Sequence, residues 1–401
     1  MKKSLLVVLM GFLCLSAYAQ RDTTYVNPDS LKIKQIRHPQ SPVPKYQKFA
    51  LSGYVKLKGT FDFGPNIQNT SEFITASIPI SADAIQEKSR LSFDARETRV
   101  AFDGNFKVEN QMIHTYIEAD FYSSEELSNK LFNLRLAYLD VWKLHIGRDW
   151  STFVNLDATP LQVDFEGPNS LPGPKNEMIR FVQNLSNTTV LDIALEMHSS
   201  DYTAILAEDP KYQTVPDLVS KITFNKKWGQ LSIAGLMRDI AYLNNSSETK
   251  HLFGGGANIA GTVNLYPSAK GLQKDGLLFM AVAGKGISYY LDDLSGSGLD
   301  AVSLTDNSLS TLGAGGGYLA FQHYWSDTMS STAMGSYLML EKDNRIDPTN
   351  FKSSVYVSGN FIATPIKNLT VGIEYLYGKL ALQNSQSGDA SRIQSMVMYS
   401  F

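Results

Sequence analysis

Cysteine, long apolar runs and an excess of positive charge are all scarce in this chain of 401 residues. Its one cysteine, Cys14, falls within an N-terminal leader, so the chain without that leader contains no thiol. This excludes disulfides, thiol catalysis and cysteine-ligated metal sites from the mature chain. A chain free of cysteine also suits passage through an oxidising compartment such as a periplasm.

No apolar run beyond the leader approaches the roughly 20 residues that a membrane-spanning helix requires, and residues 277–283 form one of the longest. The formal net charge is −3, and it becomes −5 when Lys2 and Lys3 are removed with the leader. Since there is no basic excess, nucleic acid is not an expected partner. Aromatic residues, by contrast, are plentiful, with 20 tyrosines and 20 phenylalanines.

Residues 1–19 have the pattern of a cleaved signal peptide: two lysines at the start, an apolar run, and the small residues Ala17 and Ala19. The run is too short for a comfortable membrane anchor. Lipidation at Cys14 is disfavoured because the bulky Leu13 precedes it. Residues 20–50 contain several prolines and no apolar period, which predicts an irregular periplasmic arm.

From residue 51 onwards, apolar and polar residues alternate. Between residues 113 and 121, for example, apolar positions alternate with His114, Tyr116, Glu118 and Asp120. A β-strand turns alternate side chains to opposite faces. The pattern therefore predicts strands with an apolar outer face and a polar inner face, as in a transmembrane barrel with a wet interior.

Long polar links and short turns alternate along the same region. The long links are predicted at residues 64–88, 123–130, 148–176, 199–216, 243–250, 291–308, 342–350 and 381–390. The short turns are predicted at residues 103–105, 139–141, 186–187, 228–229, 326–327 and 365–368, with a longer exception at 267–275. This rhythm is typical of outer-membrane barrels. We therefore expect an all-β, antiparallel transmembrane barrel of about sixteen strands over residues 51–401. A soluble sandwich or propeller is disfavoured, because no linker or fixed repeat is present.

The chain ends on an alternating stretch, residues 391–401, in which Ile393, Val397, Tyr399 and Phe401 share one face. Aromatic residues at strand ends are typical of the girdles of membrane barrels. This ending resembles the signal by which the outer-membrane assembly machinery recognises its clients. It predicts that machinery as a partner through Phe401, the lipid bilayer as surroundings, and the outer membrane of a Gram-negative cell as the location.

The third long link, residues 148–176, is the longest, and in general porins the corresponding loop folds into the lumen. A barrel of this size is wide enough for an aqueous channel, whose narrowest side chains set its selectivity. The candidate constriction residues are Arg90, Arg96, Arg99, Arg135, Arg148, Arg180, Asp157, Asp164 and Glu166. We expect the arginines to attract small organic anions and the loop carboxylates to shape the field. The alternative is that the arginines pair with carboxylates on neighbouring strands, such as Asp94, Glu97, Glu118 and Asp120.

Several blocks between residues 89 and 183 resemble the DcaP-like porins, most specifically Trp-Ser-Thr-Phe at 150–153 and Asp-Phe-Glu-Gly-Pro at 164–168. The resemblance implies a homotrimeric outer-membrane channel associated with uptake of dicarboxylates and related organic anions. Members can carry a helical, coiled-coil-like segment before the barrel. Residues 20–50 are too short and proline-rich for one, so a trimer here would be held by the barrel walls alone.

Two other functions stay open: a barrel enzyme and a binding or adhesion barrel, each with a plugged lumen. None of the six histidines stands in a recognisable nucleophile motif, which disfavours an enzyme. Glycine- and serine-rich stretches such as residues 295–298 fit flexible loops better than a fixed binding surface. No zinc-ligand spacing is present and no cofactor is expected, while calcium bound by loop carboxylates stays open.

Overall fold

The structure is a computed structural model that describes residues 46–80, 89–123, 131–198, 213–266, 275–304 and 308–401, together with 200–203, 205, 209 and 211. The predicted signal peptide and most of the predicted arm lie outside the described residues. The first strand begins at Tyr46, before the expected start at residue 51, so the last residues of that arm are regular strand.

Strands dominate the described chain, with only single-turn 3₁₀ helices between them. The wall consists of β1 (Tyr46–Asp62), β2 (Arg90–Asp94), β3 (Arg99–Val108), β4 (Gln111–Asp120), β5 (Asn133–Val141), β6 (Leu144–Trp150), β7 (Lys175–Ser186), β8 (Thr189–Met197), β9 (Asp217–Lys226), β10 (Gly229–Leu243), β11 (Thr249–Asn264), β12 (Gly276–Lys285), β15 (Gly313–Ser326), β16 (Met329–Leu340), β17 (Phe351–Ile366), β18 (Leu369–Leu382) and β19 (Ser387–Ser400). The short elements are η2 (Thr75–Ser77), η3 (Leu156–Ala158), η4 (Ser288–Tyr290), η5 (Asp292–Leu294), and the hairpin β13 (Ala301–Ser303) and β14 (Leu309–Thr311). None of these described helices is long and apolar enough to cross a membrane.

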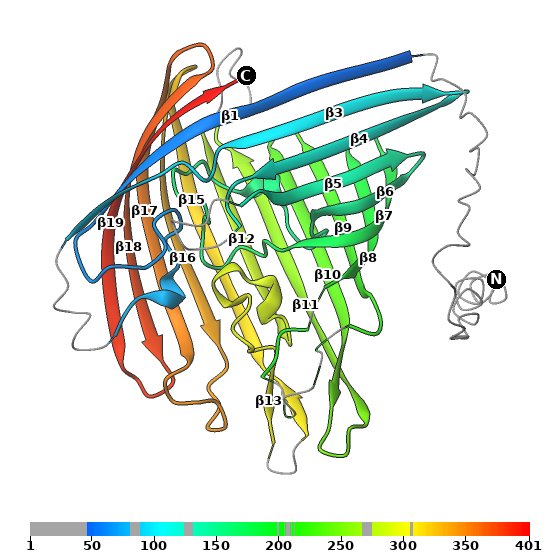
Figure 1. Ribbon diagram of the computed structural model, residues 1–401. Helices are drawn as coiled ribbons and strands as arrows, with labels where there is room; N and C mark the ends of the chain where they lie inside the picture. Colours follow the sequence, from blue (N-terminus) through cyan, green and yellow to red (C-terminus); the bar gives the residue numbers. More distant parts are fainter. Residues whose placement is uncertain are drawn as a thin grey trace, which may run out of the picture. The chain divides into compact units, whose positions relative to one another are not determined.

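The sheet closes on itself through β1, which lies beside β19 in Figure 1 (blue beside red). One half of β1 pairs with β3, from Tyr46↔Lys107 to Tyr54↔Arg99. The other half pairs with β19 and, on its opposite edge, with β2. Because β2 and β3 are two halves of one strand, interrupted at residues 95–98, the seventeen segments form sixteen strands. The prediction of a closed antiparallel barrel of about sixteen strands is confirmed.

The two faces of the wall differ as the alternation predicts. On β4, Ile117 is half exposed while the neighbouring Glu118 is buried, and on β18 Ile373 is half exposed while Glu374 is fully buried. Apolar side chains on the outer face meet lipid, where they carry no hydration penalty. The polar side chains consequently point into the barrel.

The interior is nevertheless not uniformly polar, which the alternation does not predict. On the inner face of β16 to β18, Leu338, Tyr356 and Leu376 are fully buried and pack in one apolar cluster with loop residues such as Phe73 and Leu171. Loop segments therefore pack against the inside of the wall. Burial of apolar surface between loop and wall holds these segments in place.

The short turn expected at residues 103–105 is wrong. β3 continues through this stretch to Val108, and the turn follows at Glu109 and Asn110, where Glu109 has a positive φ of 53°. The Asp-Gly-Asn sequence is typical of turns. Here Gly104 instead makes room for a ring, because a Cβ at this position would lie 2.9 Å from the side chain of Phe106. The link expected at 381–390 is also shorter, since β18 and β19 leave only residues 383–386 between them.

Candidate functional site

The link between β6 and β7, residues 151–174, makes hydrogen bonds to side chains on strands spread around the barrel, from the neighbouring β8 to β17. The carboxylate of Glu196 on β8 accepts from the Thr152 backbone N–H at 2.7 Å. The Asn258 amide on β11 donates to the Phe153 carbonyl at 2.7 Å, and the Asn360 amide on β17 donates to the Leu161 carbonyl at 2.7 Å. The wall side chains in these bonds are buried and lie on the face opposite the exposed apolar residues.

Two other links meet this segment. In residues 63–80, Thr75 donates to the Asp293 carboxylate, and the Ala76 backbone N–H donates to the same oxygen at 2.8 Å. In residues 286–300, the Asp292 backbone N–H donates to the Leu171 carbonyl at 3.0 Å. Three links from different parts of the sequence therefore join one another and the inner face of the wall.

A network of ion pairs, called here the basic wall, covers the inner face of β1 to β5 and β19. Its cations are Lys56, Lys58, Arg90, Arg96, Arg99, Arg135 and Arg392, and its carboxylates are Asp62, Asp94, Glu97, Glu118 and Asp120. Seven cations share five carboxylates, so the network carries two excess positive charges.

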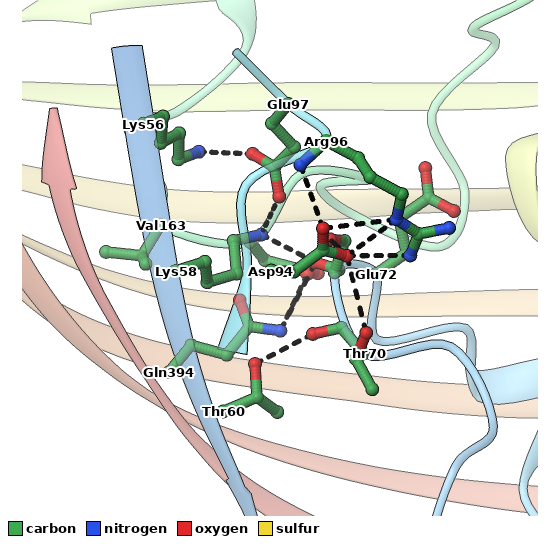
Figure 2. Close-up of polar contacts among 12 residues, drawn as sticks. Lys56, Lys58, Thr60, Thr70, Glu72, Asp94, Arg96, Glu97, Val163 and Gln394 are labelled. Atoms are coloured by element: carbon green, nitrogen blue, oxygen red, sulfur yellow. Dashed lines mark hydrogen bonds and ion pairs between the residues drawn. The ribbon is translucent and has the colours of Figure 1, made fainter. Parts of the chain in front are cut away.

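Figure 2 shows how the basic wall holds the first long link. Lys56 and Lys58 reach the same Glu97 carboxylate from β1, and Lys58 also donates to the Ser71 carbonyl at 2.6 Å. Arg96 binds the Asp94 carboxylate through its Nε and Nη2 atoms. Such multidentate pairing fixes the guanidinium plane as well as its charge.

A cavity of about 300 Å³, called here the loop-side cavity, lies between the basic wall and the three links. Arg135 and Lys175 line it with positive charge, and the aromatic rings of Trp150 and Phe165 also contact it. Its carboxyl groups are Glu72, Glu166, Asp292 and Asp293, all from the links.

Burial changes the ionisation of these carboxyl groups. It raises the pKa of Glu72 to about 7 and that of Asp293 to about 6. Burial and the adjacent Asp293 raise the pKa of Glu166 well above its usual value, and burial also raises that of Asp292. Removing a carboxylate from water disfavours its charged form. Much of the negative charge of the cavity is therefore absent near neutral pH.

A second cavity of about 330 Å³, the turn-side cavity, lies nearer the short turns of β7 to β10. Arg180 and Lys221 line it, together with Asp149, Asp157 and Asp192. Trp150 lines both cavities. Arg180 fixes the Trp150 backbone, because its Nη2 donates to the Trp150 carbonyl at 2.6 Å.

A model of the DcaP outer membrane protein family matches residues 30–401. The chain is a member of the DcaP outer membrane protein family. The resemblance seen in the motif blocks is confirmed, and so is the location in the outer membrane. No curated protein matches the chain.

Solved structures of outer-membrane channels have the same fold. The outer membrane channel DcaP of Acinetobacter baumannii aligns with a TM-score of 0.75 at 21% identity, covering 88% of this chain and 97% of that chain. An anion-selective porin from Comamonas acidovorans aligns with a TM-score of 0.56 at 8% identity, covering 89% and 100%. The trimer form of OmpT from Vibrio cholerae aligns with a TM-score of 0.52 at 8% identity, covering 88% and 99%.

Most of the predicted constriction residues of this DcaP-family chain lie on the inner face, but they form two groups. Arg90, Arg96, Arg99 and Arg135 belong to the basic wall, where each has a carboxylate partner. This pairing is the alternative that the sequence left open for the arginines. On the turn side, Arg180 pairs with Asp149 at 3.4 Å.

The predicted carboxylates also separate. Glu166 lines the loop-side cavity, whereas Asp157 is exposed and accepts from the Gln230 amide at 2.7 Å in the turn-side cavity. Asp164, within the link between β6 and β7, is buried. Its carboxylate accepts from the Phe73 backbone N–H at 3.1 Å and from the Tyr356 hydroxyl at 3.0 Å.

Arg148 does not lie with the other candidates. It pairs at 3.0 Å with Glu177, which alternates with the buried Asn176 and Met178 and shares its face with the exposed Ile179. Cross-strand neighbours share a face, and Arg148 is the register partner of Glu177. The pair therefore lies on the outward face, and the expectation that Arg148 lines a constriction is wrong. The register of β6 with β7 is unbroken through Gly147, so Arg148 keeps the parity of Leu144 and Ile146, whose partners Phe181 and Ile179 are exposed. The expectation failed because β6 continues to Trp150, whereas the sequence placed Arg148 in the link.

Sequence reasoning missed several groups of the site. Lys56, Lys58 and Arg392 occupy polar positions of alternating strands, so the same parity argument could have found them. Glu72, Asp292 and Asp293 lie in irregular links, where no period indicates which side chains point inward. Among the described residues, no cluster of three or more histidine or acidic side chains has the arrangement of a metal site.

Proposed function

We propose that this DcaP-family barrel is a channel for passive diffusion of small hydrophilic solutes, with a preference for small organic anions such as dicarboxylates. The observation that carries the proposal is the loop-side cavity, lined by Arg135 and Lys175 on one side and by carboxyl groups of raised pKa on the other. Arginine and lysine stay charged near neutral pH, whereas burial shifts those carboxyl groups towards their neutral forms. The field in the cavity is then positive.

The basic wall supports the same sign of field. Its two excess positive charges are held on rigid strands, and each guanidinium is oriented by its carboxylate partners. Fixed charges in a pore with low-dielectric walls concentrate solutes of opposite charge. In this proposal the arginines act mainly through their summed field, while direct contact falls to cations that lack a carboxylate partner.

The three links narrow the lumen, so the proposal also limits solute size. Cavities of about 300 and 330 Å³ accommodate a small dicarboxylate and exclude bulky oligosaccharides. No reaction is assigned to the chain. An adhesion barrel or a barrel enzyme with a plugged lumen would pass no solute at all.

We further propose that the chain forms a homotrimer. The support is the fold shared with an outer membrane protein solved in a trimer form and the general tendency of homo-oligomers towards closed symmetry. Chemical cross-linking of the protein in outer membranes tests this, because a trimer gives a ladder that ends at three subunits.

Liposome swelling tests the solute preference. Proteoliposomes are diluted into iso-osmotic solutions of succinate, of a neutral triol and of a disaccharide, and swelling rates are compared with those of empty liposomes. The proposal predicts swelling with the small solutes, faster with succinate, and little swelling with the disaccharide. Swelling with no solute would leave a plugged barrel, and faster swelling with the neutral solute would remove the anion preference.

A further inference from the structure

One cation of the loop-side cavity, Lys175, lacks within the described part of the chain the carboxylate partner that each arginine predicted to line a constriction has. The ammonium of Lys175, at the start of β7, lies 3.7 Å from the centroid of the Trp150 ring. It forms no ion pair or hydrogen bond with the residues that the structure describes. Arg135, the other cation of this cavity, donates to Glu118 at 2.9 Å and to Asp120 at 3.0 Å.

This difference decides which group an incoming anion meets. The charge of a guanidinium that already binds two carboxylates is largely neutralised, and two of its N–H donors are occupied. A further anion therefore gains little binding energy from it. An ammonium over an aromatic face is held by the ring quadrupole, and the N–H donors that do not point at the ring stay available. Lys175 is half-buried and lines the cavity. Its charge is therefore presented to the cavity with unused donors.

Charged groups from the other side of the cavity also face Lys175. They are the carboxyl groups of Asp292 and Asp293 on η5 and those of Glu72 and Glu166 on the other two links. Asp292 accepts from the Gly173 backbone N–H, close to Lys175, but does not reach it as an ion pair. An anion that enters the cavity can thus contact Lys175 without first displacing a carboxylate.

Trp150 occupies the boundary between the two cavities. Its ring contacts the loop-side cavity under Lys175, and the residue also lines the turn-side cavity beside Arg180. Arg180 fixes residues 150–152 from the side of the turn-side cavity. It donates to the Trp150 carbonyl at 2.6 Å and to the Thr152 hydroxyl at 2.8 Å. Trp150 is thus the residue that the two cavities have in common.

We propose that Lys175 and Trp150 together form the selectivity element of the channel. Lys175 is the cation that contacts the solute anion in the loop-side cavity, and Trp150 is the partition that the anion passes on its way to Arg180 and Lys221. This inference rests on the proposed function, because it names the residues through which the anion preference acts. It assigns the selectivity to a lysine and not to the arginines that the sequence singled out.

The test is the reversal potential of single channels in a KCl gradient, measured for the wild type, Lys175→Gln and Lys175→Arg. Removing one charge from a confined site should lower the anion-over-cation permeability ratio roughly fivefold, and Lys175→Arg should retain most of it. Lys250→Gln, which removes an equal charge from an exposed loop-end pair with Glu248, serves as the matched control and should leave the ratio unchanged. Trp150→Ala should raise the conductance and, because the ring no longer holds the Lys175 ammonium, should lower the anion preference, though less than Lys175→Gln does.

The lack of cysteine outside the predicted leader permits a second form of the test that does not depend on comparing separately folded variants. In Lys175→Cys channels already inserted in a bilayer, a thiosulfonate reagent that adds an ammonium should restore the anion preference. A reagent that adds a sulfonate should reverse it. Both reagents should be without effect on the wild type.

The outcomes separate the two proposals. A wild-type channel without anion preference overturns the proposed function itself. A wild-type channel that prefers anions, combined with unchanged selectivity in Lys175→Gln and no response of Lys175→Cys to either reagent, overturns only the role of Lys175. A fall in preference that Lys250→Gln reproduces would assign the effect to net charge and would also overturn it.

Discussion

The carboxylate of Glu374 on β18 accepts a hydrogen bond from the backbone N–H of Val163 at 2.7 Å, through the same oxygen that accepts from Asp164 at 2.8 Å. Glu374 is fully buried. One wall side chain therefore holds the far end of the long link between β6 and β7, about half a barrel away from the strands that this link joins. The position of both cavities depends on such anchors.

Glu374→Ala should release that link. It leaves two buried N–H donors without an acceptor, and each unsatisfied donor costs about 1–3 kcal/mol. We expect a lower free energy of unfolding in urea, followed by tryptophan fluorescence, and noisier single-channel currents. Glu248→Ala, in an exposed pair with Lys250, should change neither. Equal stability and equally quiet currents for both variants would show that Glu374 is not an anchor.

Arg392 should anchor the first long link, residues 63–80, as Glu374 anchors the link between β6 and β7. It binds Asp62 at 2.6 Å and donates to the carbonyls of Glu72 at 2.9 Å and Asn69 at 2.8 Å, and its side chain is fully buried. Arg392→Met leaves the two carbonyls without this donor, while Asp62 keeps Arg90 as its partner. The free energy of unfolding should fall by about 1–3 kcal/mol for each buried group left unsatisfied.

The exposed pair Arg345–Asp343 provides the control for Arg392. Arg345→Met should leave the free energy of unfolding nearly unchanged, because exposed ion pairs contribute little to stability. A similar loss of stability in both variants, measured by urea titration, would contradict a special role of the buried pair.

Strand alternation was enough to predict the closed barrel. Residues such as Ile117 and Glu118 repeat the same contrast of faces from strand to strand, and a register shift by one residue would expose every polar side chain to lipid. The Asp103-Gly104-Asn105 turn was wrong for a local reason, since residues typical of turns also occur in strands where a neighbouring ring needs space.

The site was less predictable than the fold. Parity placed Arg135 and Arg180 on the inner face but could not indicate that each has a carboxylate partner. Arg148 was assigned to the long link, whereas β6 continues to Trp150 and puts Arg148 on the outward parity of Leu144 and Ile146. Asp292 and Asp293 lie in a link without any period, and only the folded chain brings them beside Glu166.

The anion preference should depend on pH. Below about pH 6, Glu72 and Asp293 are protonated and the loop-side cavity is most positive; as the pH rises through their pKa values of about 7 and 6, both ionise. Preference measured from reversal potentials should therefore fall between pH 5 and pH 8. Because both pKa values are raised in the folded chain, the stability that protonation adds is also lost over this interval.

Glu72→Gln combined with Asp293→Asn provides the check on that pH dependence. These changes keep the shapes of the side chains but remove their ionisation, so the preference should stay high and nearly constant from pH 5 to pH 7. An equally steep fall in this variant would assign the pH dependence to other groups.

Phe401 should matter for assembly more than for the finished fold. Its backbone completes the closure of the barrel, with hydrogen bonds to Gly53 at 3.0 and 3.2 Å, while its side chain is half exposed. Phe401→Ser keeps these backbone bonds but removes the aromatic end expected to be recognised by the assembly machinery. We expect a reduced amount of folded protein in cell outer membranes and unchanged folding into detergent in vitro. Loss of both would make Phe401 a structural residue.

The reversal potential of the wild-type channel tests the account most directly. It is measured at pH 6 in a planar bilayer with a KCl gradient, using protein whose fold is checked by heat-dependent mobility. The account predicts that the current reverses near the chloride equilibrium potential, because the basic wall and Lys175 face carboxyl groups that are largely protonated. Reversal near the potassium equilibrium potential would contradict it.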